Sequence, residues 1–277
     1  MHLRSLGFRT DLIFPTFDGR IVDRGDYLVV LTPSNPMFYW GNFLVFQGPP
    51  VAGDPMRWRS LFAEEIGMPL QASHETFGWD SPEGSVGVVE PFLEACFSLV
   101  RSRVLRTSRL RPPARVATTR VRRLETASEW NMALDLQVLC READHDEAGY
   151  RTYRIRQMER YRAMVAAGWG HWYGAFQDDR LVADLGLFHI NGLGRFQSVE
   201  THPDFRRRGI AGTLVYEAGT MALAESLSAL VIVADAGSPA EGLYVSVGFE
   251  PVEFQMGLER WPRAGPGTVD SSSAAFS

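Results

Sequence analysis

One segment of the sequence brings positive charge and small residues to the start of a predicted helix. Residues 198–219 read SVETHPDFRRRGIAGTLVYEAG: a strand-like run, a proline, three arginines, a Gly-Ile-Ala-Gly turn and a helical pattern. The first turn of a helix presents about four unpaired N–H groups and a partial positive charge, so it can hold an anion. Small residues leave these groups uncovered, and arginines add charge-assisted contacts. We therefore predict a diphosphate-binding loop made of Arg206, Arg207, Arg208, Gly209, Ile210, Ala211 and Gly212.

Other phosphate-binding motifs fit this segment less well. A Walker loop requires Gly-Lys-Ser/Thr, whereas all 28 basic residues of the chain are arginine. A dinucleotide fingerprint needs a third glycine and an acidic residue after the next strand. A lone Gly-x-x-Gly also occurs in ordinary strand-to-helix turns beside solvated arginines, so the segment alone leaves that interpretation open.

Periodic apolar residues around the loop predict the elements that position it. Residues 171–201 predict three strands joined by turns at Asp178-Asp179 and at Asn191-Gly192, the latter being a strong hairpin signal. After the loop we expect a helix, a buried parallel strand with the sequence ALVIVAD, a short helix and a last strand. Two helices precede the strands, and the second has arginines on its other sides. Its apolar side is predicted to consist of Ile155, Met158, Tyr161 and Val165.

This order predicts a mixed α/β sheet with a right-handed crossover through the helix at 209–224. Arg206-x-x-Gly209-x-Ala211 resembles the acyl-CoA signature of the GCN5-related N-acetyltransferases, the GNAT superfamily. Downstream, Leu243-Tyr244 followed by Gly248-Phe249 is similar to a second motif of that family. The resemblance covers about residues 115–260 and implies a GNAT-like acyltransferase fold.

The resemblance implies acetyl-CoA as cosubstrate, with its pyrophosphate on the backbone from Arg207 to Thr213. It also implies that the strands beside the crossover splay apart, so that the pantetheine arm pairs with Val199, Glu200 and Thr201. The N–H of Val199 or Thr201 is then expected to face the thioester oxygen. The asparagine that the family often has before the second motif is absent. Ser238 lies in that neighbourhood and is our candidate for the coenzyme contact.

Two residues are our candidates for proton transfer. In the context of Leu-Tyr and Gly-Phe we assign Tyr244 as the general acid, although many tyrosines at such positions only fill the core. Glu200 is the best-placed general base, with an exposed glutamate or an arginine partner as an equally good interpretation. His202 is a candidate for fixing the turn before Pro203, and His171 and His189 are expected on the sheet.

The acceptor site is less well marked. Asp144, His145, Asp146 and Glu147 lie between the two leading helices, where the resemblance implies a wall of the acceptor site. Their negative charge favours a cationic amine, but a solvated acidic loop is the simpler interpretation. The sequence contains no HExxH or CxxC motif, so we expect no metal.

The first half has a layout like that of the second. Residues 41–67 show the same strand, proline, glycine loop and helix as the segment above, and Phe92 and Phe97 align with Tyr244 and Phe249. We expect a degenerate copy of the same fold, so that the chain would contain two GNAT-like domains in tandem. The alternative is an unrelated α+β extension. Its prolines make a poor diphosphate cradle because proline lacks an N–H.

Length and composition complete the expectations. The 277 residues predict an N-terminal α/β domain at 1–110, a GNAT domain at 115–261 and a disordered tail at 262–277, with a boundary at the Pro-Pro segment 107–120. The net charge of −5 argues against nucleic acid, and no run approaches the roughly 20 apolar residues of a membrane helix. We expect a cytoplasmic N-acetyltransferase for a small-molecule amine, with a homodimer as one possible state. The alternatives are a non-catalytic acyl-CoA-binding regulatory module and a protein N-acetyltransferase.

Overall fold

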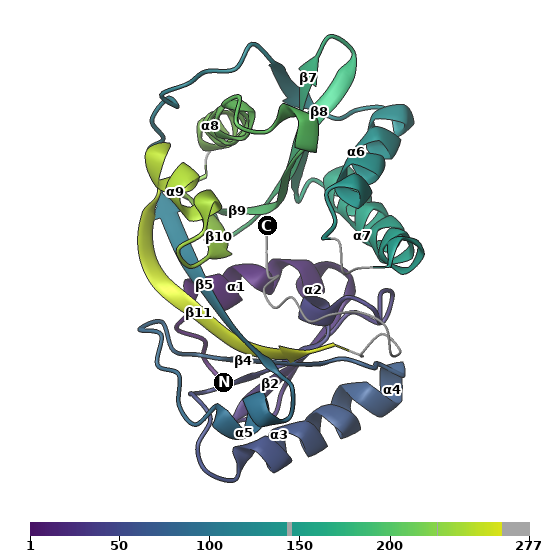
Figure 1. Ribbon diagram of the computed structural model, residues 1–277, viewed down its shortest axis with the longest axis vertical. Coiled ribbons are helices and arrows are strands. Elements are labelled where there is room, and N and C mark those ends of the chain that lie inside the picture. Colours follow the sequence, from purple (N-terminus) through teal and green to yellow (C-terminus); the bar gives the residue numbers. More distant parts are fainter. Residues whose placement is uncertain (143–145, 226, 262–277) are drawn as a thin grey trace. The chain divides into compact units, whose positions relative to one another are not determined.

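The computed structural model describes residues 1–142, 146–225 and 227–261. The chain forms two compact units (Figure 1). One comprises Met1–Arg103 together with the strand residues from Glu253 onward, and the other comprises Val104–Val252. Asp144, His145 and the predicted tail lie outside the described residues. None of the described helices is long and apolar enough to cross a membrane.

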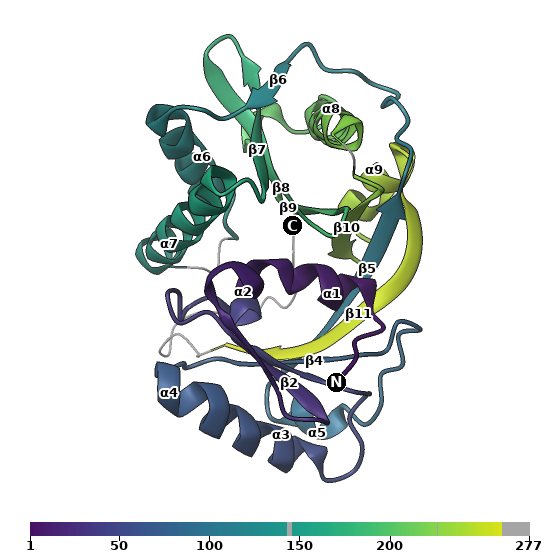
Figure 2. The same ribbon diagram turned by 180° about the vertical axis from the view of Figure 1, so that it is seen from behind.

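The second unit has the predicted order of elements and one additional strand. Its strands pair in the order β6-β7-β8-β9-β10, and β6 lies at the edge beside β7 (Figure 2). The sequence analysis missed β6 because three of its four residues are arginine and show no apolar alternation. In chain order, the second half of the sequence forms β6 (Arg120–Arg123), α6 (Ala127–Leu139), α7 (Glu147–Ala166), β7 (Gly170–Gln177), β8 (Arg180–Ile190), β9 (Leu193–Thr201), α8 (Ile210–Ala224), β10 (Ala229–Asp235), α9 (Pro239–Ser246) and β11 (Glu250–Arg260).

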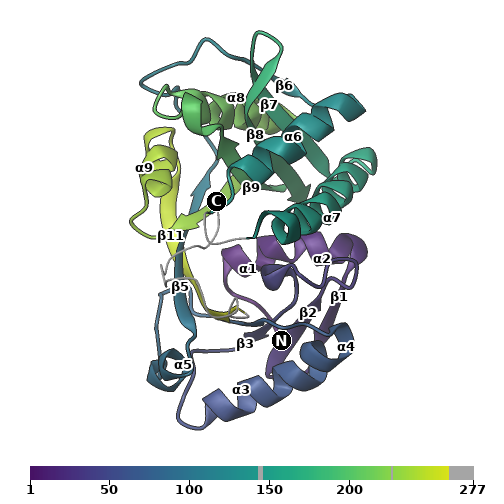
Figure 3. The same cartoon turned by 45° about the vertical axis from the view of Figure 1, so that its right-hand side comes forward.

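Turn chemistry sets the antiparallel part of this sheet. Asp178, Asn191 and Gly192 all have positive φ, at 53°, 49° and 78°, so both predicted hairpin turns are confirmed. β7, β8 and β9 are antiparallel, and β9 then pairs with β10 in parallel through the α8 crossover. Helices α6 and α7 cover one face of the sheet and α8 the other (Figure 3).

The face that α7 buries differs from the prediction. Met158 and Tyr161 are buried as expected, but Ile155 is 38% exposed. The buried side of the helix instead includes Arg154 and Gln157. This face of α7 is therefore mixed: Tyr161 stacks on Trp172 and Phe188 of the sheet, whereas Arg154 bonds to Ser198.

The Pro-Pro segment 107–120 is not the domain boundary that we expected. It lies along α8: the amide of Ala117 donates to Thr213 Oγ1 at 2.9 Å, and Arg115 Nη1 donates to the carbonyl of Arg207 at 2.8 Å. The Arg111 amide similarly bonds to the carbonyl of Val247 at 2.9 Å. The segment is therefore a packed part of the second unit.

The first unit repeats the order of the second: two helices, three strands, a helix, a strand, a helix and a strand. β1–β2 and β2–β3 are antiparallel and β3–β4 is parallel, as are their counterparts β7–β8, β8–β9 and β9–β10. Apart from β6 and the short helix α4, which have no counterparts, the strand order is the same in both halves, and this supports the predicted repeat. The elements are α1 (Leu6–Asp11), α2 (Ile13–Asp18), β1 (Arg20–Asp23), β2 (Tyr27–Leu31), β3 (Phe43–Phe46), α3 (Asp54–Phe62), α4 (Met68–Leu70), β4 (Glu75–Trp79), α5 (Glu90–Glu94) and β5 (Ser98–Thr107).

The last strand of each repeat pairs with a strand of the other repeat. β11 pairs antiparallel with β4 of the first unit, from Met256 opposite Trp79 to Arg260 opposite Glu75. In the second unit, the strand next to β10 is β5. Residues 253–261 therefore belong with the N-terminal unit, and the predicted division at residues 110 and 115 is wrong for this strand. Sequence order alone does not reveal such an exchange of strand partners.

Candidate active site

The strands β9 and β10 separate beside the predicted loop. Their parallel pairing covers only Leu193–Arg195 with Ala229–Val231, although β9 continues to Thr201 and β10 to Asp235. A β-bulge interrupts the pairing of β9 with β8, and Ser198 within it has φ of 51°. Bulges bend a strand and leave backbone groups unpaired. The splay that the resemblance implied is thus present.

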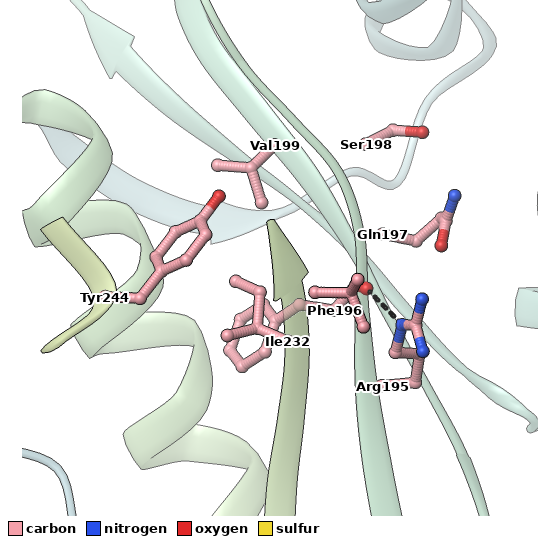
Figure 4. Close-up of a pocket in the computed structure, with 8 residues that line it drawn as sticks. Arg195, Phe196, Gln197, Ser198, Val199, Ile232 and Tyr244 are labelled. Carbon is pink, nitrogen blue, oxygen red and sulfur yellow. Dashed lines mark hydrogen bonds between the residues drawn. The ribbon is translucent and has the colours of Figure 1, made fainter. Parts of the chain in front are cut away.

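A small hollow opens at this point. Residues 195–199 of β9, Ile232 and Val233 of β10, and Tyr244 of α9 line it. Figure 4 shows Val199 and Tyr244 on one side of β9 and Ser198 on the other. Of the predicted site residues, the structure brings Val199 and Tyr244 together in the hollow, whereas Glu200 and Thr201 follow it along the strand.

Tyr244 has the properties of a proton donor. Its side chain is 3% exposed and packs edge-on against Phe249 with ring centroids 6.3 Å apart. Its hydroxyl makes no hydrogen bond to the described part of the chain and points toward Val199 (Figure 4). Burial raises the pKa of Tyr244, and the charge of Glu200 adds to this effect. The phenol therefore stays protonated at neutral pH.

Glu200 lies on the side of β9 that α6 and α7 cover, near Cys140, Arg154 and Arg206. Burial raises the pKa of Glu200 to about 7, against the opposing effects of Arg154, Cys140 and Arg206. Such a carboxyl group is part ionised at neutral pH and can accept a proton from an ammonium group. Its position and environment suit the predicted general base.

A second buried carboxyl group, missed by the sequence analysis, faces Glu200 across the strands. Asp184 of β8 is the register partner of Glu200. It accepts hydrogen bonds from Gln137 Nε2 at 2.8 Å and Trp172 Nε1 at 3.0 Å, and burial raises its pKa to about 8. A signal was present: Asp184 is the one charged residue inside the apolar run LVADLGLF.

The predicted anion-binding loop precedes α8 without a side-chain cap. Gly209 is the N-cap residue, with φ of 82°, and the first turn of α8 holds no acidic residue. The amide of Thr213 donates to the carbonyl of Gly209 at 3.0 Å, so the backbone bonding of the helix starts there. The N–H groups of Ile210, Ala211 and Gly212 precede that bond and suit a diphosphate.

The small residues of the loop also have a packing role that the sequence did not reveal. A Cβ atom on Gly209 would lie 2.4 Å from the carbonyl oxygen of Arg115, and the positive φ adds strain. Gly209 is thus required by the chain that packs on α8, and replacing it by valine does not isolate coenzyme binding. Ala211 is free of this constraint and is half-buried.

The three loop arginines have different environments. Arg206 Nε donates to the carbonyl of Thr201 at 3.1 Å, and Arg208 Nη2 to the carbonyl of Asp204 at 2.7 Å. The side chain of Arg207 is exposed and makes no polar contact with the described residues. Arg207 is therefore the arginine best able to reach a bound anion.

Several candidate residues use their side chains within the fold. The hydroxyl of Thr213 donates to the carbonyl of Gly209 and accepts from Ala117. The hydroxyl of Ser238 caps α9 by accepting from the amide of Glu241 at 3.3 Å. His202 accepts from the amide of Asp204, so its predicted role in the turn is confirmed.

The acidic segment is described only in part. Asp146 caps α7 by accepting from the amide of Gly149 at 2.7 Å, and Glu147 pairs with Arg141 at 2.7 Å. Both acids thus serve the start of α7. Within the described ranges, no group of three or more His, Cys, Asp or Glu side chains is placed to hold a metal ion.

In the corresponding loop of the first unit, a carboxylate side chain of the protein itself lies at the start of the helix. Gly53, with φ of 93°, is the N-cap of α3 as Gly209 is of α8. The carboxylate of Asp54 accepts from the amide of Val51 at 2.9 Å. In addition, the rings of Phe46 and Trp58 stack at 3.8 Å between β3 and α3. The first unit therefore lacks the open helix start of the second.

A helix start without a cap beside two splayed strands is the arrangement that the resemblance to the GNAT fold implied. Residues 130–249 match the acetyltransferase (GNAT) family. This part of the chain is therefore a GNAT domain. No curated protein matches the chain by sequence.

Solved structures extend the likeness in fold to both halves. A GCN5-related N-acetyltransferase from Kribbella flavida matches 96% of this chain and 97% of its own, with a TM-score of 0.60 and 16% identity. A functionally unknown conserved protein from Staphylococcus epidermidis matches 88% and 94%, with a TM-score of 0.70 and 14% identity. A tandem GNAT protein from the clavulanic acid biosynthesis pathway matches 74% and 70%, with a TM-score of 0.51 and 14% identity. At these identities the likeness concerns the fold alone.

Proposed function

We propose that the protein is an acetyl-CoA-dependent N-acetyltransferase that acts on a small-molecule amine. One observation carries the proposal: the hollow between the splayed strands β9 and β10 has a protonated phenol, Tyr244, on one side, and Glu200, with a pKa of about 7, follows on β9. A general acid and a general base thus flank the place where the strands separate. A module that only binds acyl-CoA has no need of this pair.

The coenzyme supplies an activated acetyl thioester, and the residues of the chain bind it and move protons. The amides at the start of α8, with Arg207, are suited to bind the diphosphate. The free edges of β9 and β10 are suited to pair with the pantetheine amides. As the carbon–nitrogen bond forms and the carbon–sulfur bond breaks, Glu200 takes a proton from the amine. Tyr244 gives a proton to the sulfur that leaves.

Two conservative variants test the assignment of acid and base. Tyr244→Phe and Glu200→Gln are each expected to lower kcat by about 100-fold or more, because each removes one proton-transfer group. Initial rates of thiol release with acetyl-CoA and a panel of amines measure this. For the wild type, kcat/KM is expected to rise with pH up to about 7, since Glu200 acts only when ionised. In Glu200→Gln this rise should be absent.

Coenzyme affinity is the control. Calorimetry with acetyl-CoA should give dissociation constants within about threefold of the wild type for both variants, since Glu200 is expected to pair with the pantetheine arm through its backbone alone and Tyr244 lies outside the loop before α8. If turnover of Tyr244→Phe equals that of the wild type, the acid is wrongly assigned. If the wild type binds acetyl-CoA and acetylates no amine, the non-catalytic alternative replaces the enzyme.

A further inference from the structure

The face of α7 that packs on the sheet carries an arginine that the proposed mechanism does not use. Arg154 is 7% exposed. A guanidinium group stays charged in proteins, and burying it is costly unless a carboxylate or good hydrogen bonds compensate. A buried arginine of this kind calls for an inspection of its partners.

Every hydrogen-bond partner of Arg154 in the described structure is neutral, although the charge of Glu200 acts on it without an ion pair. Nε donates to the Tyr150 hydroxyl at 2.9 Å, and Nη1 donates to Gln157 Oε1 at 2.9 Å and Ser198 Oγ at 3.3 Å. The guanidinium also lies over the rings of Tyr150 and Tyr153, at 5.2 and 5.3 Å from their centroids. Arg154 forms no ion pair with the described carboxylates, and Nη2 makes no hydrogen bond there. The positive charge of Arg154 and the N–H groups of Nη2 can therefore bind an anion.

The position of Arg154 connects this charge to the acceptor side of the site. Ser198, which it contacts, lies in the β9 bulge and lines the hollow on the side away from Tyr244 (Figure 4). Glu200 lies two residues further along β9 and interacts electrostatically with Arg154. The proposed base and a buried cation thus lie on the same side of one strand. A molecule with an ammonium and a carboxylate group on neighbouring atoms matches this arrangement of opposite charges.

We propose that Arg154 binds the carboxylate of the acceptor, which makes the acceptor an amino acid or a related amino carboxylate. This inference rests on the proposed acetyl transfer. The carboxylate pairs with the guanidinium while the amine faces Glu200, so that the acceptor is held by its charged ends. A role of Arg154 confined to holding Ser198 in the bulge is the competing explanation.

The first test compares matched acceptors on the wild-type protein. Initial rates are measured with the standard L-amino acids, with their α-carboxamides and with the corresponding amines that lack the carboxyl group. For the acceptor that reacts fastest, kcat/KM is expected to exceed that of its carboxamide by about 100-fold or more, because the carboxamide leaves the buried charge unpaired. Equal rates with the carboxamide would overturn the proposal without any variant.

The second test uses variants of two arginines on the same helix. Arg154→Gln is expected to lower kcat/KM for the amino acid about 100-fold, mainly through KM, and that for the carboxamide less than about threefold. Arg154→Lys should be intermediate, since it keeps the charge and loses the fork. Arg151→Gln is the control, because the side chain of Arg151 is 42% exposed and pairs with Asp135 at 2.9 Å. Thermal unfolding and acetyl-CoA calorimetry check that each variant is folded and binds coenzyme.

The outcomes separate this proposal from the proposed function. An equal loss for amino acid and carboxamide in Arg154→Gln would mean that Arg154 only positions the bulge, and the proposal would fail. If no acceptor reacts, the same amino acids are titrated into protein saturated with coenzyme A. Binding to the wild type and not to Arg154→Gln then supports the carboxylate site although acetyl transfer has failed. No binding to the wild type overturns it.

Discussion

At the scale of single residues, the site depends on buried polar groups in the second unit. Asp184 and Glu200 lie on two neighbouring strands and Arg154 on a helix, in a part of the interior that also buries Gln137, Gln157 and Ser198. The two carboxyl groups are register partners on β8 and β9, and burial raises the pKa of both. Their protonation therefore couples the stability of this unit to pH as well as its chemistry.

The stability of the protein should fall as pH rises because of Asp184. Its folded-state pKa is about 8, above the value of about 3.9 in unfolded chains, so the folded state holds an extra proton between these values. The contribution of Asp184 to the free energy of unfolding is fully present below about pH 4 and is lost as the pH rises toward 8. The slope from this group is up to about 1.4 kcal/mol per pH unit. Asp184→Asn removes the titration and should flatten the dependence. Urea unfolding at pH 5, 6, 7 and 8 measures the slope.

The exposed turn residue Asp179 is the matched control for this experiment. Asp179→Asn should keep the wild-type slope. Asp184→Asn also exchanges a hydrogen-bond acceptor for a donor, so its stability at any one pH can change while the slope remains the diagnostic quantity. A slope for Asp184→Asn equal to that of the wild type would show that Asp184 does not hold the extra proton.

At the scale of elements, the junctions α5–β5 and α9–β11 repeat one another residue by residue. The amide of Phe97 donates to the carbonyl of Phe92 at 3.0 Å, and that of Phe249 to Tyr244 at 3.1 Å. Cys96 and Gly248, each the residue before, have φ of 63° and 103°. The turn requires a left-handed residue in both copies, and only the second copy has glycine there. The first copy carries the strain.

Substitutions at these two equivalent positions should have opposite effects. Cys96→Gly is expected to raise the free energy of unfolding by up to about 1 kcal/mol, because the left-handed region costs a side chain about 1–2 kcal/mol and glycine returns part of this in entropy. Gly248→Ala should lower it by more than about 1 kcal/mol, since its Cβ would also lie 3.0 Å from the carbonyl oxygen of Arg109. Chemical denaturation under reducing conditions compares them. A destabilised Cys96→Gly would contradict the equivalence of the turns.

At the scale of the whole molecule, the exchange of last strands makes each unit depend on residues from the other end of the chain. Met256 and Leu258 of β11 are fully buried in the core of the first unit, together with Phe77 and Trp79 of β4. Leu105 of β5 is likewise buried in the core of the second unit. Neither repeat contains its complete core in one continuous segment.

A chain that ends at Val252 should therefore lose the cooperative unfolding of its first unit. The deletion removes β11 from its pairing with β4 and takes Met256 and Leu258 out of the core, at about 2–4 kcal/mol for each side chain. This loss is comparable with the whole stability of a domain. A chain that ends at Trp261 keeps these contacts and serves as the control. Circular dichroism during thermal unfolding of both chains measures the effect, and identical transitions would mean that the first unit does not need β11.

Much of the fold and part of the site could be predicted from short stretches of sequence. The turn at Asn191-Gly192, the strand at 229–235, the open helix start at Ile210 and the Tyr244 motif depend on residues close together in the chain. Backbone preferences, periodicity and hydrogen bonding at helix ends act over a few residues, so local sequence carries this information.

Other features depend on contacts between distant segments, which no local pattern contains. The packing of Arg115 against Gly209, the polar buried face of α7 and the pairing of β11 with β4 each join parts of the chain far apart in sequence. Arg154 and Asp184 acquire a role only because folding brings them next to Ser198 and Glu200. Burial, and with it the cost of a charge and the shift of a pKa, is a property of the assembled interior.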